Sequence, residues 1–319
     1  MTHWSISSIV LTQEAESLWL EVEIISEDKN LFYIKWNWKE VLFKSTDFWL
    51  NSSLWLKIAN DKELTNNVLD YHSLPTAQSF YVLPEEIDTI DNLKLKFPVI
   101  VKPLEEWHGN GVIMNIQSKE ELKEKLKESF ESYNKMIIQR QIEWEEYRVL
   151  VLGDEILVAV NREAASVIWN WIDTIEKLIN KENNNPLRAE SYSSPLSKIV
   201  IDNELKDYLD LISLDISKIP KSWDKIQLRP NSNIWSGWIY NNVTNIMSDS
   251  IKSDCIKATK ALGLVMWWID IITTDLTQSL DETNGIILEV NATPWIWGLT
   301  SIEGTDIPNK ILKSLFFNE

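Results

Sequence analysis

Short apolar runs alternate with longer amphipathic stretches along this chain, and the alternation predicts a mixture of strands and helices. We expect strands over residues 97–103, 135–142, 145–152, 155–160 and 264–272, and a last strand that begins at Ile286. We expect helices over residues 52–71, 118–133, 174–180, 205–214 and 248–262. Residues 10–45 are typical of a small helix-and-hairpin segment with little functional content.

Polar residues interrupt two of the apolar runs near the C-terminus. Glu289 and Asn291 are two positions apart in a predicted strand, so their side chains point to the same face. Oxygen ligands of this kind suit Mg²⁺, which proteins usually hold through one or two carboxylates and the phosphates of a substrate. Asp270 lies in another apolar run, where a carboxylate is costly unless it is paired or bound to metal. The alternatives are a solvated pair on an edge strand and a structural acid at Asp270.

A second candidate site follows the run of residues 97–103. Lys102 stands at the end of this predicted strand, and Gly109 and Gly111 lie in the loop that follows. A lysine beside a glycine-bearing loop suits phosphate capture, because the ammonium and the backbone N–H groups can face one anion. A lone Gly-x-Gly is a weak signal, and Lys62, in the predicted helix before it, taken alone would be a surface lysine.

Composition narrows the class of protein. The 319 residues exceed the usual size of a single core, so we expect one domain of several lobes or two domains. A net charge of −17 argues against general nucleic-acid binding. No apolar stretch reaches the ~20 residues of a membrane span, and the N-terminus does not resemble a signal peptide, so a cytoplasmic protein is expected. One cysteine and three histidines exclude internal disulfides and Cys-based zinc sites and make a His cluster improbable.

Glycine and tryptophan occur in abnormal numbers. The chain has 8 Gly and 17 Trp, and the two together match the ~7% that glycine alone usually reaches. Trp also stands in settings where turns call for Gly, as in Trp169-Asn170-Trp171 and Trp267-Trp268. We hypothesise that these are glycine positions, as they would be if UGA codons read as glycine in the native host were translated as tryptophan. An intact mass from that host that matches seventeen tryptophans would refute the hypothesis.

The order of the motifs resembles the ATP-grasp superfamily. The matching segments are Asp61-Lys62, Val101-Lys102-Pro103, the glycine loop 107–112, the hinge after residue 138 with its following Glu146-Tyr147-Arg148, residues 226–238 and residues 289–298. Within the superfamily the chain is most similar to the ligase domain of cyanophycin synthetases and bifunctional glutathione synthetases, and more loosely to D-alanine-D-alanine ligases and RimK-type ligases. The resemblance runs from about Phe48 to the C-terminus.

The resemblance implies an α+β ATP-grasp fold. Two α/β lobes with antiparallel sheets would clasp ATP, with a nucleotide lobe at about residues 48–138 and a larger lobe at about 139–319. Residues 1–47 would be a reduced version of the preceding lobe.

The resemblance also implies roles for individual residues. Lys62 and Lys102 would hold the α- and β-phosphates of ATP. The loop with His108, Gly109 and Gly111 would close over the β- and γ-phosphates, the hinge with Gln139, Gln141 and Ile142 would meet adenine, and Glu146 would bind the ribose. Asp270, Glu289 and Asn291 would bind two Mg²⁺ ions, which Mn²⁺ could replace. Arg229 would stabilise charge on the transferred phosphoryl group or acyl oxygen, and Arg148, Arg162 and Asn233 would line the acceptor side, unless the first two are ordinary ion-pair residues.

The implied activity is an ATP-dependent carboxylate–amine ligase that works through an acylphosphate and releases ADP and phosphate. Its substrates would be a small-molecule or peptide carboxylate and an amine, with no nucleic acid or membrane as partner. The alternatives are an ATP-binding regulatory module without catalysis and a ligase domain that needs a missing partner. The oligomeric state stays open, with a homodimer as one candidate.

Departures from the family fall mainly on tryptophan. Trp107, Trp144, Trp169, Trp171, Trp235, Trp238, Trp268, Trp295 and Trp297 stand where the family has Gly or another small residue. An indole at a phosphate-binding position would block the approach of the backbone. Gln139 stands where the family commonly has Glu, and its amide keeps an acceptor for the adenine amino group.

Overall fold

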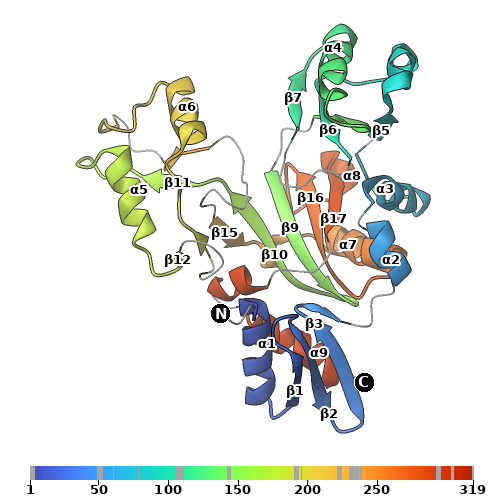
Figure 1. Cartoon of the computed structure of the whole chain (residues 1–319), viewed down its shortest axis with the longest axis vertical. Coiled ribbons are helices and arrows are strands. Elements are labelled where there is room, and N and C mark those ends of the chain that lie inside the picture. Colours follow the sequence, from blue (N-terminus) through green and yellow to red (C-terminus); the bar gives the residue numbers. More distant parts are fainter. Residues whose placement is uncertain are drawn as a thin grey trace.

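A central sheet organises three lobes in the computed structural model (Figure 1). The structure describes residues 4–48, 53–59, 61–77, 79–104, 111–141, 145–189, 194, 196–220, 225–229, 237, 239–291, 296–302 and 305–317. We call the surrounding parts the N-terminal lobe, the middle lobe (residues 79–140) and the insertion lobe (residues 165–229). Each has a hydrophobic core, and the core of the N-terminal lobe continues onto the central sheet.

The central sheet has five antiparallel strands in the order β15-β10-β9-β16-β17. Their bounds are Ile239–Asn242, Glu155–Glu163, Glu145–Leu152, Met266–Thr273 and Ile286–Asn291. One face is buried under α2 (Ser53–Ala59), α3 (Lys62–Tyr71) and α7 (Asp249–Ala261) through apolar residues such as Val149 and Ile269. Because side chains alternate along a strand, the neighbours Arg148 and Asp270 point to the opposite face.

The N-terminal lobe is built from both ends of the chain. It contains α1 (Ile6–Ser17), β1 (Glu21–Ser26), β2 (Leu31–Trp36), β3 (Lys39–Lys44) and β4 (Asp47–Phe48), with η5 (Trp297–Ser301) and α9 (Ile307–Phe316). The rings of Phe32 and Phe43 stack with centroids 5.3 Å apart, and α1 packs against α9. The helix-and-hairpin expected over residues 10–45 is confirmed, and the C-terminal helix completes its core.

The middle lobe is a sheet with one covered face. Its strands, in the order β5-β8-β6-β7, are Ser79–Val82, Met136–Arg140, Val99–Pro103 and Ile113–Ile116. The helices η1 (Pro84–Asn92) and α4 (Lys119–Ser129) cover the face that carries Val99 and Val101. Lys102 follows the buried Val101 on β6, and Gln139 follows the buried Ile138 on β8, so both side chains point to the other face of this sheet. There they line a cleft toward the central sheet.

The insertion lobe has a core that the sequence patterns did not predict. It contains β11 (Ser166–Ile168), α5 (Ile175–Asn183), β12 (Arg188–Ala189), β13 (Leu196–Ser197), α6 (Asn203–Leu211) and β14 (Lys225–Gln227). Val167, Ile179, Leu205 and Ile226 are buried together there. The short elements η4 (Thr244–Ile246) and α8 (Leu280–Thr283) complete the larger lobe.

One expected helix is wrong in its extent. The helix expected over residues 52–71 is two helices, because Asp61 caps the start of α3 by accepting hydrogen bonds from the N–H groups of Glu63 and Leu64 at 2.9 and 3.1 Å. Both helices pack on the central sheet rather than in the middle lobe. The strand β8 ends at Arg140, and the lobe boundary expected at about residue 138 stays a prediction.

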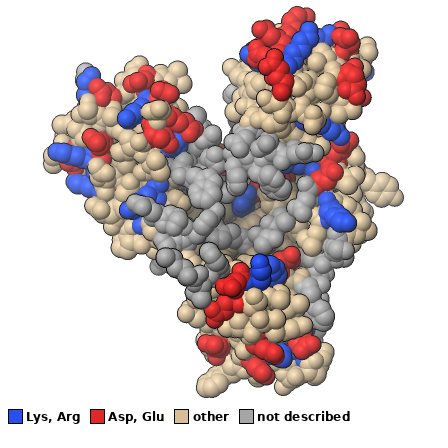
Figure 2. Space-filling view, in the orientation of Figure 1, with Lys and Arg blue, Asp and Glu red and all other residues tan. Residues whose placement is uncertain are grey.

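Three further observations complete the description of the fold. Among the described residues, no helix combines the length and the apolar character needed to cross a membrane. Cys255 is fully buried in α7, and burial raises the pKa of its thiol. Acidic and basic side chains are mixed over the outer surfaces of the lobes (Figure 2).

The helices α1, α3, α6 and α7 end in the same backbone motif, and the residue at its left-handed position is Trp in α1, Ser in α3 and α6, and Gly in α7. The residue after the C-cap is Trp19 in α1 and Gly263 in α7, with φ of 62° and 59°, and each is flanked by leucines. The closing bonds are Leu20 N–H to Ala15 O and Trp19 N–H to Glu16 O in α1, and Leu264 N–H to Thr259 O and Gly263 N–H to Lys260 O in α7. Glycine is the usual residue in this left-handed position. Trp171 also has a positive φ, of 70°, as the glycine hypothesis expects.

Replacing Trp19 by Gly is expected to raise the free energy of unfolding by about 1 kcal/mol. A side chain in the left-handed region costs roughly 1–2 kcal/mol, only part of which is offset by the greater freedom of Gly in the unfolded chain. The indole of Trp19 is 87% exposed, so little packing is lost. Urea denaturation measures the change.

Trp38→Gly is the matched control for this experiment. Trp38 is 90% exposed but is not among the described residues with positive φ. Its replacement should leave stability unchanged or lower it. A Trp19→Gly variant that is no more stable than Trp38→Gly would contradict the expectation.

Candidate functional site

Two lysines meet in a cleft between the middle lobe and the central sheet. Lys102 comes from β6 and Lys62 from the first turn of α3, and Gln139 and Glu289 line the same cleft. The pKa of Lys102 is lowered to about 8, mainly by burial; the negative charge of Glu289 opposes this shift, and the positive charge of Lys62 adds to it. Two ammonium groups brought together from different lobes favour an anion between them.

An ion pair fixes the carboxylate of the central sheet. Arg148 donates from Nε and Nη2 to the two oxygens of Asp270, both at 2.6 Å, across the paired strands β9 and β16. The side chains are 14% and 4% exposed. Asn291 Nδ2 donates to the same carboxylate at 2.7 Å, which leaves its own amide oxygen for another partner. The pKa of Arg148 is raised, since the attraction of Asp270 outweighs the opposite effect of burial.

Two further carboxylates lie close to this pair. Glu289 is directly opposite Asp270 in the β16–β17 ladder, and no hydrogen bond or ion pair of its carboxylate is found within the described part of the chain. Burial raises the pKa of Glu146 to about 7, and the negative charge of Asp270 adds to the effect. Like charges directly opposite each other are unfavourable, so a cation would stabilise this arrangement.

Gln139 presents an unsatisfied oxygen. Its Nε2 donates to Ser79 Oγ at 2.7 Å, and Ser79 Oγ donates to the carbonyl of Ala77 at 2.9 Å. Because the single hydroxyl proton of Ser79 is used, Ser79 can only accept from Gln139, which sets the orientation of the amide. Gln139 Oε1 is buried and has no partner among the residues that the structure describes. A buried acceptor of this kind costs free energy until a donor meets it.

These residues fit Mg²⁺ and a phosphorylated ligand. Glu289, the amide oxygen of Asn291 and the remaining lone pair on Asp270 are hard oxygen donors that lie on one face of the sheet. No group of three or more His, Cys, Asp or Glu with metal-binding geometry occurs in the described ranges. A cation here would therefore take its remaining ligands from water or from a ligand's phosphates, while Lys62 and Lys102 supply the positive charge beside it.

Arg229 is not brought into this cleft. It is 3% exposed in the insertion lobe and donates to Asp202 and Glu204, both at 2.7 Å, and to the carbonyl of Val200 at 2.9 Å. The expected strand end is close, since β14 ends at Gln227. The catalytic role predicted for Arg229 would require these ion pairs to be exchanged for a substrate, and the role stays a prediction.

Several predicted residues cannot be placed in the cleft. His108, Gly109, Ile142 and Asn233 lie outside the described residues. Arg162 lies one residue before the end of β10, as expected, and only its backbone is described.

The two other residues of the predicted nucleotide set have defined surroundings. Gln141 Oε1 accepts from the N–H of Asn115 at 2.5 Å. Gly111 has φ of 70°, and a Cβ there would lie 2.7 Å from both Pro103 and Tyr133, so only glycine fits.

Sequence patterns missed the residues that support the site. Ser79, Asn66 and Tyr81 contact one another between α3 and β5, although no local motif marks them. Their partners are distant in sequence, so only the tertiary structure brings them together. No signal in the sequence alone would have selected them.

A protein-family model and several known proteins match parts of this chain. Residues 59–167 match the RimK-like ATP-grasp domain. The chain is 30% identical over 252 residues to cyanophycin synthetase from Synechocystis sp., which covers 76% of this chain and 28% of that protein. It is 27% identical over 300 residues to the glutathione biosynthesis bifunctional protein GshAB from Clostridium perfringens, which covers 91% of this chain and 38% of that protein. The chain thus spans less than two fifths of either relative.

A solved structure has the same fold. The crystal structure of a bifunctional glutathione synthetase from Pasteurella multocida matches with a TM-score of 0.81 and 24% identity, over 98% of this chain and 43% of that one. The α+β ATP-grasp fold expected from the sequence is confirmed.

Glu146→Gln is expected to stabilise the metal-free chain at pH 8 by about 2 kcal/mol. The folded pKa of Glu146, about 7, lies above the ordinary value of 4.5, so the folded state keeps this proton to higher pH than the unfolded state does. The contribution of Glu146 to stability therefore falls as pH rises from about 4.5 to 7 and is constant above that range. Glutamine has no such dependence.

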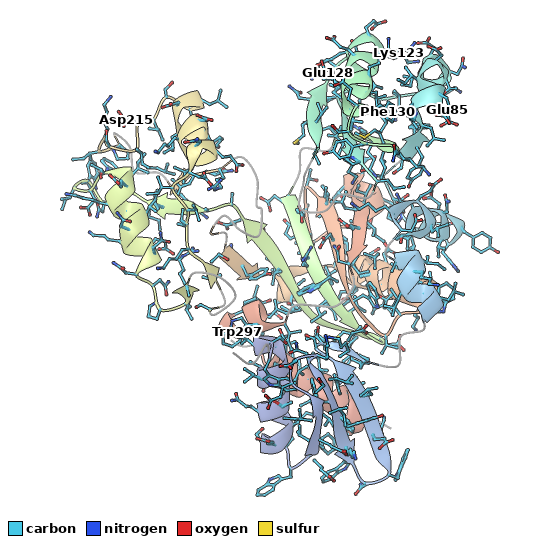
Figure 3. The ribbon with its side chains drawn as sticks, in the orientation of Figure 1. Glu85, Lys123, Glu128, Phe130, Asp215 and Trp297 are labelled. Atoms are coloured by element: carbon cyan, nitrogen blue, oxygen red, sulfur yellow. The ribbon has the colours of Figure 1, made fainter. Side chains whose placement is uncertain are left out.

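Denaturation in EDTA at several pH values between 4.5 and 8 measures this difference. Glu85→Gln is the control, because Glu85 is exposed on η1 at the outer end of the middle lobe (Figure 3). If both variants follow the wild-type pH dependence, the buried state of Glu146 is refuted.

Proposed function

We propose that this chain, which carries a RimK-like ATP-grasp domain, is an ATP-dependent carboxylate–amine ligase that forms an amide or peptide bond. The observation that carries the proposal is the cleft in which Lys62 and Lys102 face the oxygen donors of Glu289 and its neighbours. The relatives are named as synthetases and so support a reaction of this class. The substrates would be a small-molecule or peptide carboxylate and an amine.

The chemistry needs charge neutralisation rather than a protein nucleophile. A carboxylate oxygen of the substrate attacks the γ-phosphorus of ATP, and ADP leaves. The amine then attacks the acyl carbon, phosphate leaves with the bonding electrons, and the amine nitrogen gives up a proton. Phosphoryl transfer depends mainly on alignment and on compensation of negative charge. Two lysines from opposite walls of the cleft provide both.

Asp270, Glu289 and Asn291 would hold Mg²⁺, with two ions expected. The ions would neutralise the phosphate oxygens and polarise the transferred phosphoryl group. Arg148 orients Asp270 through its two hydrogen bonds. Arg148 thus acts on the reaction through Asp270 and does not itself need to reach the substrate.

Gln139 and Glu146 would bind the nucleoside. The unsatisfied Oε1 of Gln139 can accept from the amino group of adenine, and Ser79 holds it in that orientation. Glu146 would accept from the ribose hydroxyls. Its burial near Asp270 means that ligand binding, which brings donors and cations, would favour its ionised form.

A nucleotide-binding module without catalysis is the second candidate. It is favoured by one observation, namely that both oxygens of Asp270 already accept hydrogen bonds from Arg148 and Asn291. A ligase domain that needs a partner domain is the third candidate.

We expect the chain to release ADP from ATP in the presence of Mg²⁺ when the right carboxylate and amine are supplied. A screen of amino acids and short peptides, run with the chain as printed and with Gly at all seventeen Trp positions, measures it. ATP binding without turnover for any substrate pair would support the binding module instead.

Glu289→Gln is expected to lower turnover by about 100-fold, because an oxygen donor for the cation loses its charge. ADP release under saturating substrates is the measurement. Glu155→Gln is the control, since Glu155 is exposed at the start of β10 in the same sheet. Equal turnover in the two variants would show that the reaction does not need the charge of Glu289.

A further inference from the structure

The first turn of α3 lies between two separately packed parts of the molecule. Leu69 of α3 is buried in the core under the central sheet, whereas Tyr81 and Lys135 belong to the middle lobe. Lys62 is therefore attached to one wall of the cleft, and Lys102 on β6 is attached to the other. The distance between the two ammonium groups depends on how these parts are held together.

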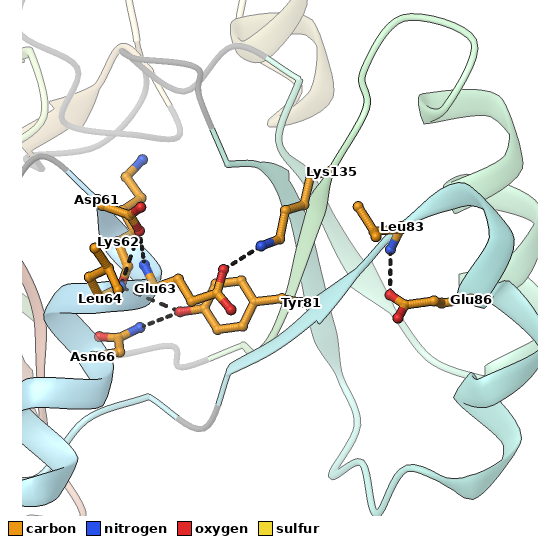
Figure 4. Close-up of polar contacts among 9 residues, drawn as sticks. All are labelled: Asp61, Lys62, Glu63, Leu64, Asn66, Tyr81, Leu83, Glu86 and Lys135. Atoms are coloured by element: carbon orange, nitrogen blue, oxygen red, sulfur yellow. Dashed lines mark hydrogen bonds and ion pairs between the residues drawn. The ribbon is translucent and has the colours of Figure 1, made fainter.

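Polar contacts join the two parts at this turn (Figure 4). Lys135 Nζ forms an ion pair with the carboxylate of Glu63, and the two side chains are 31% and 32% exposed. Asn66 Nδ2 donates to the hydroxyl of Tyr81 at 3.1 Å, and that hydroxyl donates to the carbonyl of Lys62 at 3.4 Å. Lys135 also lies over the ring of Tyr81, 5.3 Å from its centroid.

The same contacts extend to Gln139, the residue proposed to bind adenine. Asn66 Nδ2 lies 3.2 Å from Ser79 Oγ, which in turn accepts from Gln139. Lys62 and Gln139 are thus linked through a continuous set of hydrogen bonds that crosses from α3 to β5 and β8. Burial raises the pKa of Tyr81, so its hydroxyl stays a donor at neutral and mildly alkaline pH.

We propose that Lys135–Glu63 and Tyr81–Asn66 form a latch, the α3 latch, that positions Lys62 against Lys102 for the phosphates of ATP. The proposal rests on the proposed function, in which this cleft binds ATP. A partly exposed ion pair contributes little stability by itself, so the main effect of the latch is geometric. Small displacements of a binding group are costly when two walls must meet one ligand. Lys135 and Tyr81 are therefore positioning residues.

Lys135→Met tests the latch by removing the charge while keeping the length of the side chain. We expect ATP to bind about tenfold more weakly, with a raised KM for ATP and a kcat within about twofold of wild type, because the chemical groups are untouched. Lys135→Arg keeps the charge and should retain wild-type affinity. Calorimetric titration with ATP and steady-state ADP release give the two quantities.

Lys123→Met is the matched control. Lys123 pairs with Asp91 at 2.7 Å in the same lobe, but at its outer end (Figure 3). This variant should bind ATP like wild type. Equal ATP affinity in Lys135→Met and wild type, or equal weakening in Lys135→Met and Lys123→Met, would overturn the latch alone. A wild-type chain that binds no ATP would overturn the proposed function together with it.

Tyr81→Phe provides a second variant with little change in volume. It removes the hydroxyl that links Asn66 to the carbonyl of Lys62. Faster hydrogen exchange in the first turn of α3, with unchanged exchange in α7, is expected for both Tyr81→Phe and Lys135→Met. Unchanged exchange in that turn for both variants contradicts the latch whatever their affinity for ATP.

Discussion

The ion pair between Arg148 and Asp270 makes a charged face of the central sheet compatible with folding. Asp270 sits in a strand whose neighbouring residues are buried, and an unpaired carboxylate in such a place would be strongly destabilising. The two hydrogen bonds from Arg148 compensate this charge and also orient it. Glu146 and Glu289 can then lie beside Asp270, so that the sheet is apolar under α7 and anionic toward the cleft. The same alternation of side chains thus produces the core and the site.

The cleft brings two positive charges together in a chain that is acidic overall. The net charge is −17, yet Lys62 and Lys102 converge where the middle lobe meets the sheet. Burial is the main cause of the lowered pKa of Lys102, and the nearby positive charge of Lys62 adds to it, so an anion in the cleft would stabilise the charged form. In the proposed function a phosphorylated ligand would supply that anion, and a cation bound to Asp270, Glu289 and Asn291 would join it to the acidic face. Affinity for such a ligand would then depend on the local placement of charge and not on the net charge.

Much of the fold could be predicted because strand and helix periods are local properties. The strands β9 and β17 and the helix α7 agree with the expected segments. Glu289 and Asn291 share one face as their spacing requires, and strand pairing brings Asp270 to the same face. The helices α5 and α6 of the insertion lobe were expected, but their packing into a separate core and the division between α2 and α3 were missed, since these depend on tertiary packing and on one capping residue. The partners of Arg229 and Lys135 could not be predicted either. Contacts between residues far apart in sequence are decided by the tertiary structure alone.

The matching ends of α1 and α7 have a practical consequence for producing the protein. Leu-Trp-Leu and Leu-Gly-Leu close the two helices through the same hydrogen bonds. If the seventeen Trp positions are encoded by UGA, a laboratory host that uses the standard code would stop synthesis after His3, because Trp4 is the first of them. No helix or strand of the molecule would then be made. A recoded synthetic gene is then the starting point for every measurement on this chain.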